Sequence, residues 1–251
     1  MAKPDNLLPE SLYGGLVPTM NNTGFMTSEM DEYSKNFAVF AGERGILGEE
    51  SLDIGCAYGI ATLAALDMGA NIFACDIESK HLEILEQRVP AEAKNRFRCK
   101  QGTMPDVHFE ASSFGAILAA RVFHFLDGKQ IEETLENMYR WLKPGGRLYL
   151  IVDTPYAGGP WYKYVGRYEK RKAAGDLWPG FVDDYADLLP EGIDPAEHPD
   201  FINPMDTDIL ARVCANAGFT VLSTATLSGS TANAKGNEHA GIIASKPMGK
   251  D

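Results

Sequence analysis

The chain has 251 residues, of which 45% are hydrophobic and 23% are charged. This composition fits one large globular domain or two small ones and excludes a disordered or collagen-like chain. Lysine and arginine number 23 against 35 aspartates and glutamates, which gives a formal net charge of −12. A charge of that sign disfavours nonspecific binding to nucleic acid and to anionic lipid, so we expect neither as a partner.

We expect neither a membrane segment nor a metal site. The first residues lack the charged start and unbroken apolar stretch of a signal peptide, and no apolar run approaches the roughly 20 residues of a membrane helix. The four cysteines show no CxxC pair and no Cys/His spacing typical of a metal site. The sequence therefore predicts a cytoplasmic protein with reduced thiols.

From residue 51 onwards, short apolar runs alternate with longer amphipathic ones, a pattern typical of an α/β fold around a mostly parallel sheet. The pattern predicts strands over residues 51–54, 71–75, 96–101, 114–120 and 147–153. It predicts helices around residues 28–47 and over residues 62–68, 80–89, 130–142 and 207–217. The runs at 219–227 and 239–246 have only a short polar loop between them, so we expect an antiparallel pair at the sheet edge.

The regular pattern stops between residues 154 and 206, where proline and aromatic residues are frequent. Disordered linkers are poor in aromatic residues, so we interpret this segment as an ordered lid on the substrate side. The alternative is a static cap whose aromatic side chains only fill its own core. Four parts result: an N-terminal helical segment (1–50), a binding core (51–153), the lid (154–206) and a C-terminal completion of the core (207–251).

A turn that contains glycines follows the first strand of this core. The segment LDIGCAYG, residues 52–59, places Gly55 and Gly59 where the backbone must turn tightly and let a ligand approach. Asp76 ends the next strand, where an exposed carboxylate can accept hydrogen bonds from both hydroxyls of a ribose. Either feature alone is also typical of an ordinary turn or of an acid at a helix start. Together they indicate a ligand that contains adenosine.

The spacing of the glycines separates two kinds of adenosine ligand. A dinucleotide fingerprint has a third glycine that brings a helix N-terminus to the pyrophosphate, but Ile60 occupies that position. Asp53 also suits a ligand with an ammonium group better than one with a pyrophosphate. Both observations argue against NAD, and a nicotinamide-dependent oxidoreductase is kept as an alternative.

Five segments between residues 51 and 153 resemble the class I S-adenosylmethionine (SAM)-dependent methyltransferases: LDIGCAYG, ACDIE, QGTMPDVHF, FGAILAARVFHFL and LKPGGRLYL. The resemblance implies a Rossmann-like sheet of seven strands in the order 3-2-1-4-5-7-6. The sheet would be mostly parallel with its last strand antiparallel, flanked by helices and carrying an insertion after strand 5. SAM would be the cofactor, with S-adenosylhomocysteine (SAH) as its product.

The resemblance also implies residue roles, in which Asp76 holds the ribose, Ile77 packs on the adenine and Thr103 meets the adenine edge. The residues expected at the cofactor are Asp53, Gly55, Cys56, Ala57, Gly59, Asp76, Ile77, Gly102, Thr103, Met104, Ala120 and Arg121. Two of them depart from the family pattern. Ala57 replaces the usual middle glycine, which costs little if its φ is negative. Thr103 replaces an aspartate that accepts the adenine amino group, and a hydroxyl can also accept that bond.

Methyl transfer from a sulfonium is an in-line displacement that depends mainly on alignment of the reacting atoms. An acceptor that is protonated at neutral pH also needs a base, and His124, after the fourth strand, is the expected one. The alternative is that His124 only shapes the pocket. Arg121 would either bind an anionic group of the substrate or pair with an acid near the cofactor. The residues expected at the acceptor are Tyr33, Trp161, Tyr162 and Tyr164.

The sequence thus predicts a SAM-dependent methyltransferase for a small-molecule acceptor, because an aromatic lid suits the enclosure of a compact substrate. Besides the oxidoreductase, two alternatives stay open. One is a protein that binds SAM or SAH without turnover and acts as a partner or sensor, and the other is a methyltransferase that acts on a protein. The acceptor and the oligomeric state are not predicted.

Overall fold

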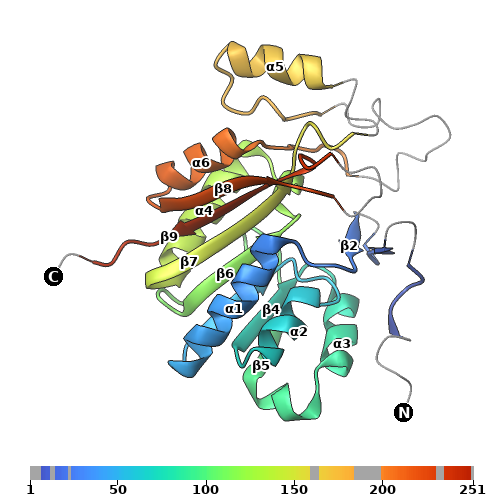
Figure 1. Cartoon of the computed structure of the whole chain (residues 1–251), viewed down its shortest axis with the longest axis vertical. Helices are drawn as coiled ribbons and strands as arrows, with labels where there is room; N and C mark the ends of the chain where they lie inside the picture. Colours follow the sequence, from blue (N-terminus) through green and yellow to red (C-terminus); the bar gives the residue numbers. More distant parts are fainter. Residues whose placement is uncertain are drawn as a thin grey trace.

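A seven-stranded sheet forms the centre of the molecule, with helices on both faces (Figure 1). The computed structural model describes residues 7–11, 15–21, 24–158, 164–183, 199–229 and 235–249. The strands of the sheet are β3 (Glu50–Ile54), β4 (Asn71–Asp76), β5 (Phe97–Gln101), β6 (Phe114–Ala120), β7 (Leu142–Asp153), β8 (Thr220–Leu227) and β9 (His239–Ser245). Their order is β5-β4-β3-β6-β7-β9-β8, and β9 runs antiparallel to both neighbours. The predicted fold and strand order are confirmed.

One strand is longer than the sequence predicted, because β7 begins at Leu142 rather than at residue 147. The Pro-Gly-Gly segment between the predicted helix (130–142) and the predicted strand (147–153) lies inside it. Here the register between β6 and β7 shifts, and Gly146 comes close to the backbone of β6. A Cβ atom at Gly146 would lie 3.0 Å from the carbonyl oxygen of Gly115. The glycines therefore let the strand start early by forming an irregularity within it.

The helices that pack on the sheet divide between its two faces. They are α1 (Glu32–Ile46), α2 (Ile60–Asp67), α3 (Ser79–Arg88), α4 (Gly128–Trp141) and α6 (Thr207–Asn216). Two short 3₁₀ helices, Ala91–Arg96 and Phe123–Phe125, lie in the connections. The first three α-helices share a buried cluster with Tyr149 and Ile151 of β7. The other two share a cluster with Leu148 and Leu150, so successive residues of one strand serve opposite faces.

The N-terminal part contains a helix at the predicted place, and a hairpin that was not predicted. Helix α1 begins later than expected because Asp31 caps it, accepting a hydrogen bond from the backbone N–H of Ser34 at 2.8 Å. Before the cap, β1 (Leu16–Pro18) pairs antiparallel with β2 (Phe25–Thr27). These strands have three residues each, too few for a periodic hydrophobic pattern to show.

The insertion between β7 and α6 has a small core of its own. Its helix α5 (Val165–Ala173) is set off from the sheet in Figure 1. The fully buried members of its core are Tyr164, Tyr168, Val182 and Ile202. Two backbone hydrogen bonds join the insertion to the strand ends, one from the N–H of Asn203 to the carbonyl of His124 and one from the N–H of Met205 to the carbonyl of Asp153.

Within the described parts of the chain, no helix has both the length and the apolar composition needed to cross a membrane. In the same residues no group of three or more His, Cys, Asp and Glu side chains is arranged to hold a metal ion.

Candidate functional site

The strand order places a topological switch point at the carboxyl ends of β3 and β6, and this place is here called the crevice. From β3 the chain builds outwards through β4 to β5, and then returns to the other side of β3 to form β6. Ligands of open α/β sheets bind outside the strand ends at such a switch point. The turns that follow β3 and β6 touch there, since a Cβ atom at Gly55 would lie 2.3 Å from Cγ1 of Val122.

Both glycines of the turn after β3 are required by its backbone. Gly55 has a φ of 72° and Gly59 a φ of 80°, in the left-handed region that favours glycine. At Gly59, the N-cap of α2, a Cβ atom would lie 2.2 Å from Cδ1 of Leu85 on α3. Packing within the protein is therefore sufficient to explain why these positions have no side chain, whether or not a ligand approaches.

Ala57 does not have the negative φ that would let it replace a glycine at little cost. Its φ is 45°, an unfavourable region for a residue with a Cβ atom. The backbone N–H of Ala57 donates a hydrogen bond of 2.7 Å to Oδ2 of Asp76. The carboxylate at the end of β4 thus holds the strained turn that follows β3.

Asp76 was expected to be exposed, but the side chain is buried, with the residue 4% accessible. Besides the bond to Ala57, its Oδ1 accepts the backbone N–H of Glu78 at 2.9 Å and lies 2.9 Å from Nδ1 of His81. The same carboxylate that can meet a ribose therefore also organises the turn and the start of α3.

His81 is a residue of this site that the sequence analysis missed. Its side chain is 1% exposed, and its Nε2 accepts a hydrogen bond of 2.9 Å from the backbone N–H of Met20. Its ring and the ring of Tyr58 pack in a T-shaped arrangement, with the two centroids 4.8 Å apart. One signal was present: His81 lies four residues before Leu85, which places it on the buried face of the helix.

The remaining predicted cofactor residues fall into a buried group and an exposed group. Asp53 is 3% exposed and accepts a hydrogen bond of 2.7 Å from the Thr62 hydroxyl; burial raises the pKa of its carboxyl to about 6. Burial likewise raises the pKa of the Cys56 thiol. Ile77 is 54% exposed, directly after Asp76. The exposed Thr103 hydroxyl lies 3.4 Å from the carbonyl oxygen of Met104.

Two more of the residues predicted at the cofactor, Gly102 and Ala120, also lie at the carboxyl ends of strands of the sheet. At Gly102, which follows β5, a Cβ atom would lie 2.7 Å from Cγ2 of Val107, so packing within the protein again excludes a side chain. Ala120 is the last residue of β6, and it is half-buried beside the crevice.

A second polar group lies where β6 and β7 end and β9 begins. Oδ1 of Asp153 lies 3.0 Å from Nδ1 of His239, and Nε2 of His239 lies 3.5 Å from Nε of Arg121. Arg121 also pairs with Asp31 at 3.0 Å, so of its two expected roles the structure shows the pairing with an acid. His239 was missed by the sequence analysis because 86 residues separate it from Asp153.

His124 lies against Asp153 in this group and is 3% exposed. Its Nδ1 accepts a hydrogen bond of 3.3 Å from the backbone N–H of Asp153 and lies 3.9 Å from the carboxylate. Burial lowers the pKa of His124. Burial alone would raise the pKa of the Asp153 carboxyl, but His124, His239 and Arg121 outweigh it and hold that pKa well below its usual range.

Of the residues predicted at the acceptor, two are placed in other surroundings. Tyr33 lies against Gly241 on the face of the sheet, and its hydroxyl is 2.9 Å from that of Ser223. This position does not fit a contact at the strand ends. Tyr164 is 2% exposed in the core of the insertion, and its hydroxyl donates to the carbonyl of Pro179 at 2.9 Å. Trp161 and Tyr162 lie outside the described residues.

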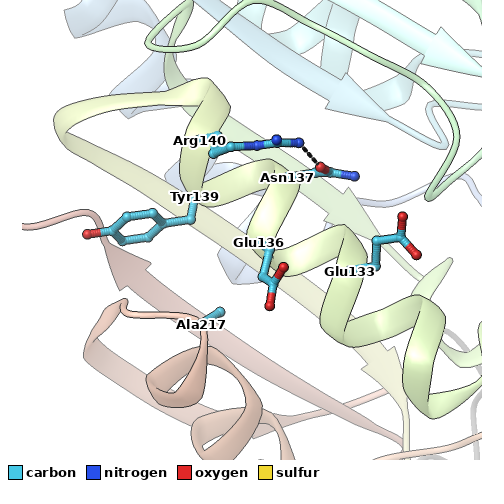
Figure 2. A pocket seen from close by; sticks show the side chains of 6 residues that line it. All are labelled: Glu133, Glu136, Asn137, Tyr139, Arg140 and Ala217. Carbon is cyan, nitrogen blue, oxygen red and sulfur yellow. Dashed lines mark hydrogen bonds between the residues drawn. The ribbon is translucent and has the colours of Figure 1, made fainter.

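A surface hollow of about 410 Å³ lies away from these residues, between α4 and the end of α6 (Figure 2). Its lining includes Glu133 and Glu136 of α4, and the guanidinium of Arg140 is hydrogen-bonded to Asn137. None of its residues belongs to the crevice or to the polar group at the strand ends. We therefore assign the site from the side chains at the strand ends and not from this hollow.

Residues 52–150 match the family model described as a methyltransferase domain. This match and the strand order together support the predicted family, the class I SAM-dependent methyltransferases. The matched residues of this methyltransferase domain contain the glycine turn, Asp76, Arg121 and His124. The predicted family is confirmed.

Several curated methyltransferases are similar to part of this chain. The cypemycin N-terminal methyltransferase of Streptomyces sp is 30% identical over 114 residues, which cover 45% of this chain and 45% of that protein. The demethylmenaquinone methyltransferase of Tropheryma whipplei (strain Twist) is 36% identical over 101 residues, which cover 40% of each. The chain thus spans less than half the length of these relatives.

Solved structures share the fold over more of the chain. A SAM-dependent methyltransferase from Methanosarcina mazei has a TM-score of 0.59 and 22% identity, over 80% of this chain and 93% of its own. The Burkholderia thailandensis 1,6-didemethyltoxoflavin-N1-methyltransferase, with its bound substrate and SAH, has a TM-score of 0.57 and 17% identity, over 86% of this chain and 79% of its own.

Proposed function

We propose that this methyltransferase domain transfers a methyl group from SAM to a small-molecule acceptor. The observation that carries the proposal is the meeting of two elements at the crevice. The glycine turn after β3 and the carboxylate that ends β4 are joined by the 2.7 Å hydrogen bond between Ala57 and Asp76. A ribose at this switch point would lie against the carboxylate, and the rest of the ligand would lie along the turn.

The residues present fit the parts of SAM. Asp76 would hold the ribose, and the exposed apolar side chain of Ile77 beside it would pack on the adenine. Thr103 presents a hydroxyl in the segment expected at the adenine edge. The glycine turn would hold the methionine part of SAM, and Asp53 is the carboxylate nearest to that turn in the sequence. When bound, SAM supplies an electrophilic methyl group on a sulfonium.

The polar group at the ends of β6 and β7 would bind the acceptor. The backbone N–H of Asp153 can only donate, so Nδ1 of His124 must accept and the neutral ring carries its proton on Nε2. Likewise Arg121 can only donate to Nε2 of His239, so neutral His239 carries its proton on Nδ1, towards Asp153. Because Nε2 of His239 has a single lone pair, it can take a proton only from an acceptor that displaces Arg121 from it. We therefore propose that the acceptor takes the place of Arg121 at Nε2 of His239 and gives its proton to that nitrogen. His124 would orient the acceptor as a hydrogen-bond donor through Nε2.

Two properties support a small molecule as the acceptor. The net charge of −12 disfavours nucleic acid, and an insertion with an aromatic core is anchored beside the proposed acceptor group by Asn203 and Met205. The names of similar proteins point to several different acceptors, among them the cypemycin N-terminus, a demethylmenaquinone and a tRNA cytidine. The class therefore has to be decided by experiment.

The first test is a calorimetric titration with SAH. Asp76→Asn should weaken binding by about 1.5–3 kcal/mol for each charge-assisted hydrogen bond lost. Asp67→Asn, at an exposed acid of α2, is the matched control and should leave the affinity unchanged. Equal affinities for both variants would refute the placement of the ribose.

The second test supplies methyl-labelled SAM together with either the small-molecule or the protein fraction of a cell extract. Label that enters only the small-molecule fraction supports the proposal, and label in protein supports protein methylation. SAH binding without release of label to either fraction supports a binding protein that acts as a partner or sensor.

A further inference from the structure

Residues 15–21 and 24–31, here named the N-terminal strap, cross the carboxyl ends of the central strands. On one side Met20 contacts His81 of α3. Further along, a Cβ atom at Gly24 would lie 3.6 Å from the ring of Phe125, which follows β6. The strap ends at Asp31, which pairs with Arg121. It therefore spans the crevice from the β4 side to the β6 side.

The strap packs directly on the glycine turn. The hydroxyl of Tyr58, a fully buried side chain of that turn, donates to the carbonyl of Pro18 at 2.7 Å. Val17 and Met26 form a buried cluster with Tyr58, against which Ala57 also packs. The strands of the strap pair only with each other and not with the main sheet. The strap can therefore part from the crevice without breaking a strand pair of the sheet.

A line of hydrogen bonds runs from the strap through His81 to the carboxylate at the crevice. The backbone N–H of Met20 can only donate, so Nε2 of His81 accepts. The neutral ring then carries its proton on Nδ1 and donates it to Oδ1 of Asp76. Oδ2 of the same carboxylate accepts the N–H of Ala57 in the glycine turn. Strap, carboxylate and turn are thereby joined by one imidazole.

This arrangement decides which carboxylate oxygen is open to a ligand. Oδ1 of Asp76 already accepts both the N–H of Glu78 and His81, which fills its two lone pairs. Among the described residues, Ala57 alone donates a hydrogen bond to Oδ2, through its backbone N–H. Oδ2 therefore keeps one acceptor position beside the turn. A ligand hydroxyl would therefore meet Oδ2.

We infer that His81 is a positioning residue, which fixes the Asp76 carboxylate for the ligand and couples ligand binding to closure of the strap over the crevice. The inference rests on the proposed function for the identity of the ligand. With His81 in place, binding at Oδ2 and docking of the strap stabilise the same arrangement of Asp76. Without it, the carboxylate loses a donor and the strap loses its link to the site.

Two substitutions at His81 separate its two hydrogen bonds. His81→Leu removes both and should weaken SAH binding by about tenfold or more. His81→Asn keeps an N–H donor near the position of Nδ1 but loses the acceptor for Met20, so it should bind SAH better than His81→Leu. Leu82→Ala, at the neighbouring buried residue of α3, is the control for loss of packing and should keep the affinity of the wild-type protein.

Hydrogen exchange reports the coupling, which a merely structural role would not produce. In the wild-type protein SAH should slow exchange of the amides in the strap, and in both His81 variants this protection should be reduced. Equal protection and equal SAH affinity in wild-type protein and His81→Leu would overturn the inference.

A measurement without ligand keeps the inference separate from the proposed function. The ¹⁵N spectrum of the imidazoles should show His81 as the tautomer protonated on Nδ1, and exchange in the strap should be faster in His81→Leu than in Leu82→Ala. A wild-type protein that does not bind SAH would refute the proposed function alone. A tautomer protonated on Nε2 would refute the link to Met20 and with it the inference.

Discussion

Replacing Ala57 by glycine should give a more stable protein than the matched replacement of Ala64, because only Ala57 lies in the left-handed region. Its φ is 45°, whereas Ala64 lies within helix α2, and both residues are partly buried. Each change removes one methyl group and adds about 0.4–1 kcal/mol of backbone freedom to the unfolded chain. Only Ala57→Gly also relieves the strain of a left-handed L-residue, about 1–2 kcal/mol.

The free energy of unfolding of Ala57→Gly should therefore exceed that of Ala64→Gly by about 1–2 kcal/mol. For a domain of this size the difference corresponds to about 2–8 °C in Tm. Urea titrations and thermal melts of the two variants and the wild-type protein measure it. If Ala57→Gly melts at or below the temperature of Ala64→Gly, the turn is not strained at Ala57 and the reasoning fails.

Two further predictions concern the same turn and the strand before it. Gly59→Ala should be destabilising, because the φ of 80° is unfavourable for alanine and its Cβ atom would lie 2.2 Å from Cδ1 of Leu85. Adding Leu85→Ala should recover the part of the stability loss that comes from this clash. Losses in the free energy of unfolding that simply add in urea titrations would contradict the prediction. Asp53 has a pKa raised from 3.8 to about 6 by burial, so the folded state binds the proton more tightly and stability falls as pH rises between these values. Asp53→Asn should remove that fall, and identical pH profiles of the two proteins would show that burial does not raise this pKa.

The sheet was predictable because a strand that is buried on both faces has an almost continuous apolar sequence. The run of β6, for example, is apolar throughout, and its predicted limits agree with the strand Phe114–Ala120. Gly55 after β3 and Asp76 at the end of β4 were also predictable, because their positions are set by the end of a predicted strand and by the turn that follows it.

The features that were missed depend on partners far away in the sequence. His81 and His239 are single polar residues whose roles come from Met20 and Asp153, 61 and 86 residues away. The φ of Ala57 depends on a carboxylate 19 residues later. The hairpin of the strap was not predictable either, because its three-residue strands have no periodic hydrophobic pattern and pack instead on Tyr58.

The reversed direction of β9 has a consequence for how such a protein diversifies. In a wholly parallel sheet the strand beside β7 would contribute its last residue to the rim, whereas the antiparallel β9 contributes its first, His239. The connection between β8 and β9 therefore leads into the proposed acceptor side, together with the insertion that follows β7. Both segments can change in length while β3, β4 and the strap keep the cofactor side as it is. Changes in either segment would therefore alter the proposed acceptor side of the crevice and leave the proposed cofactor side in place.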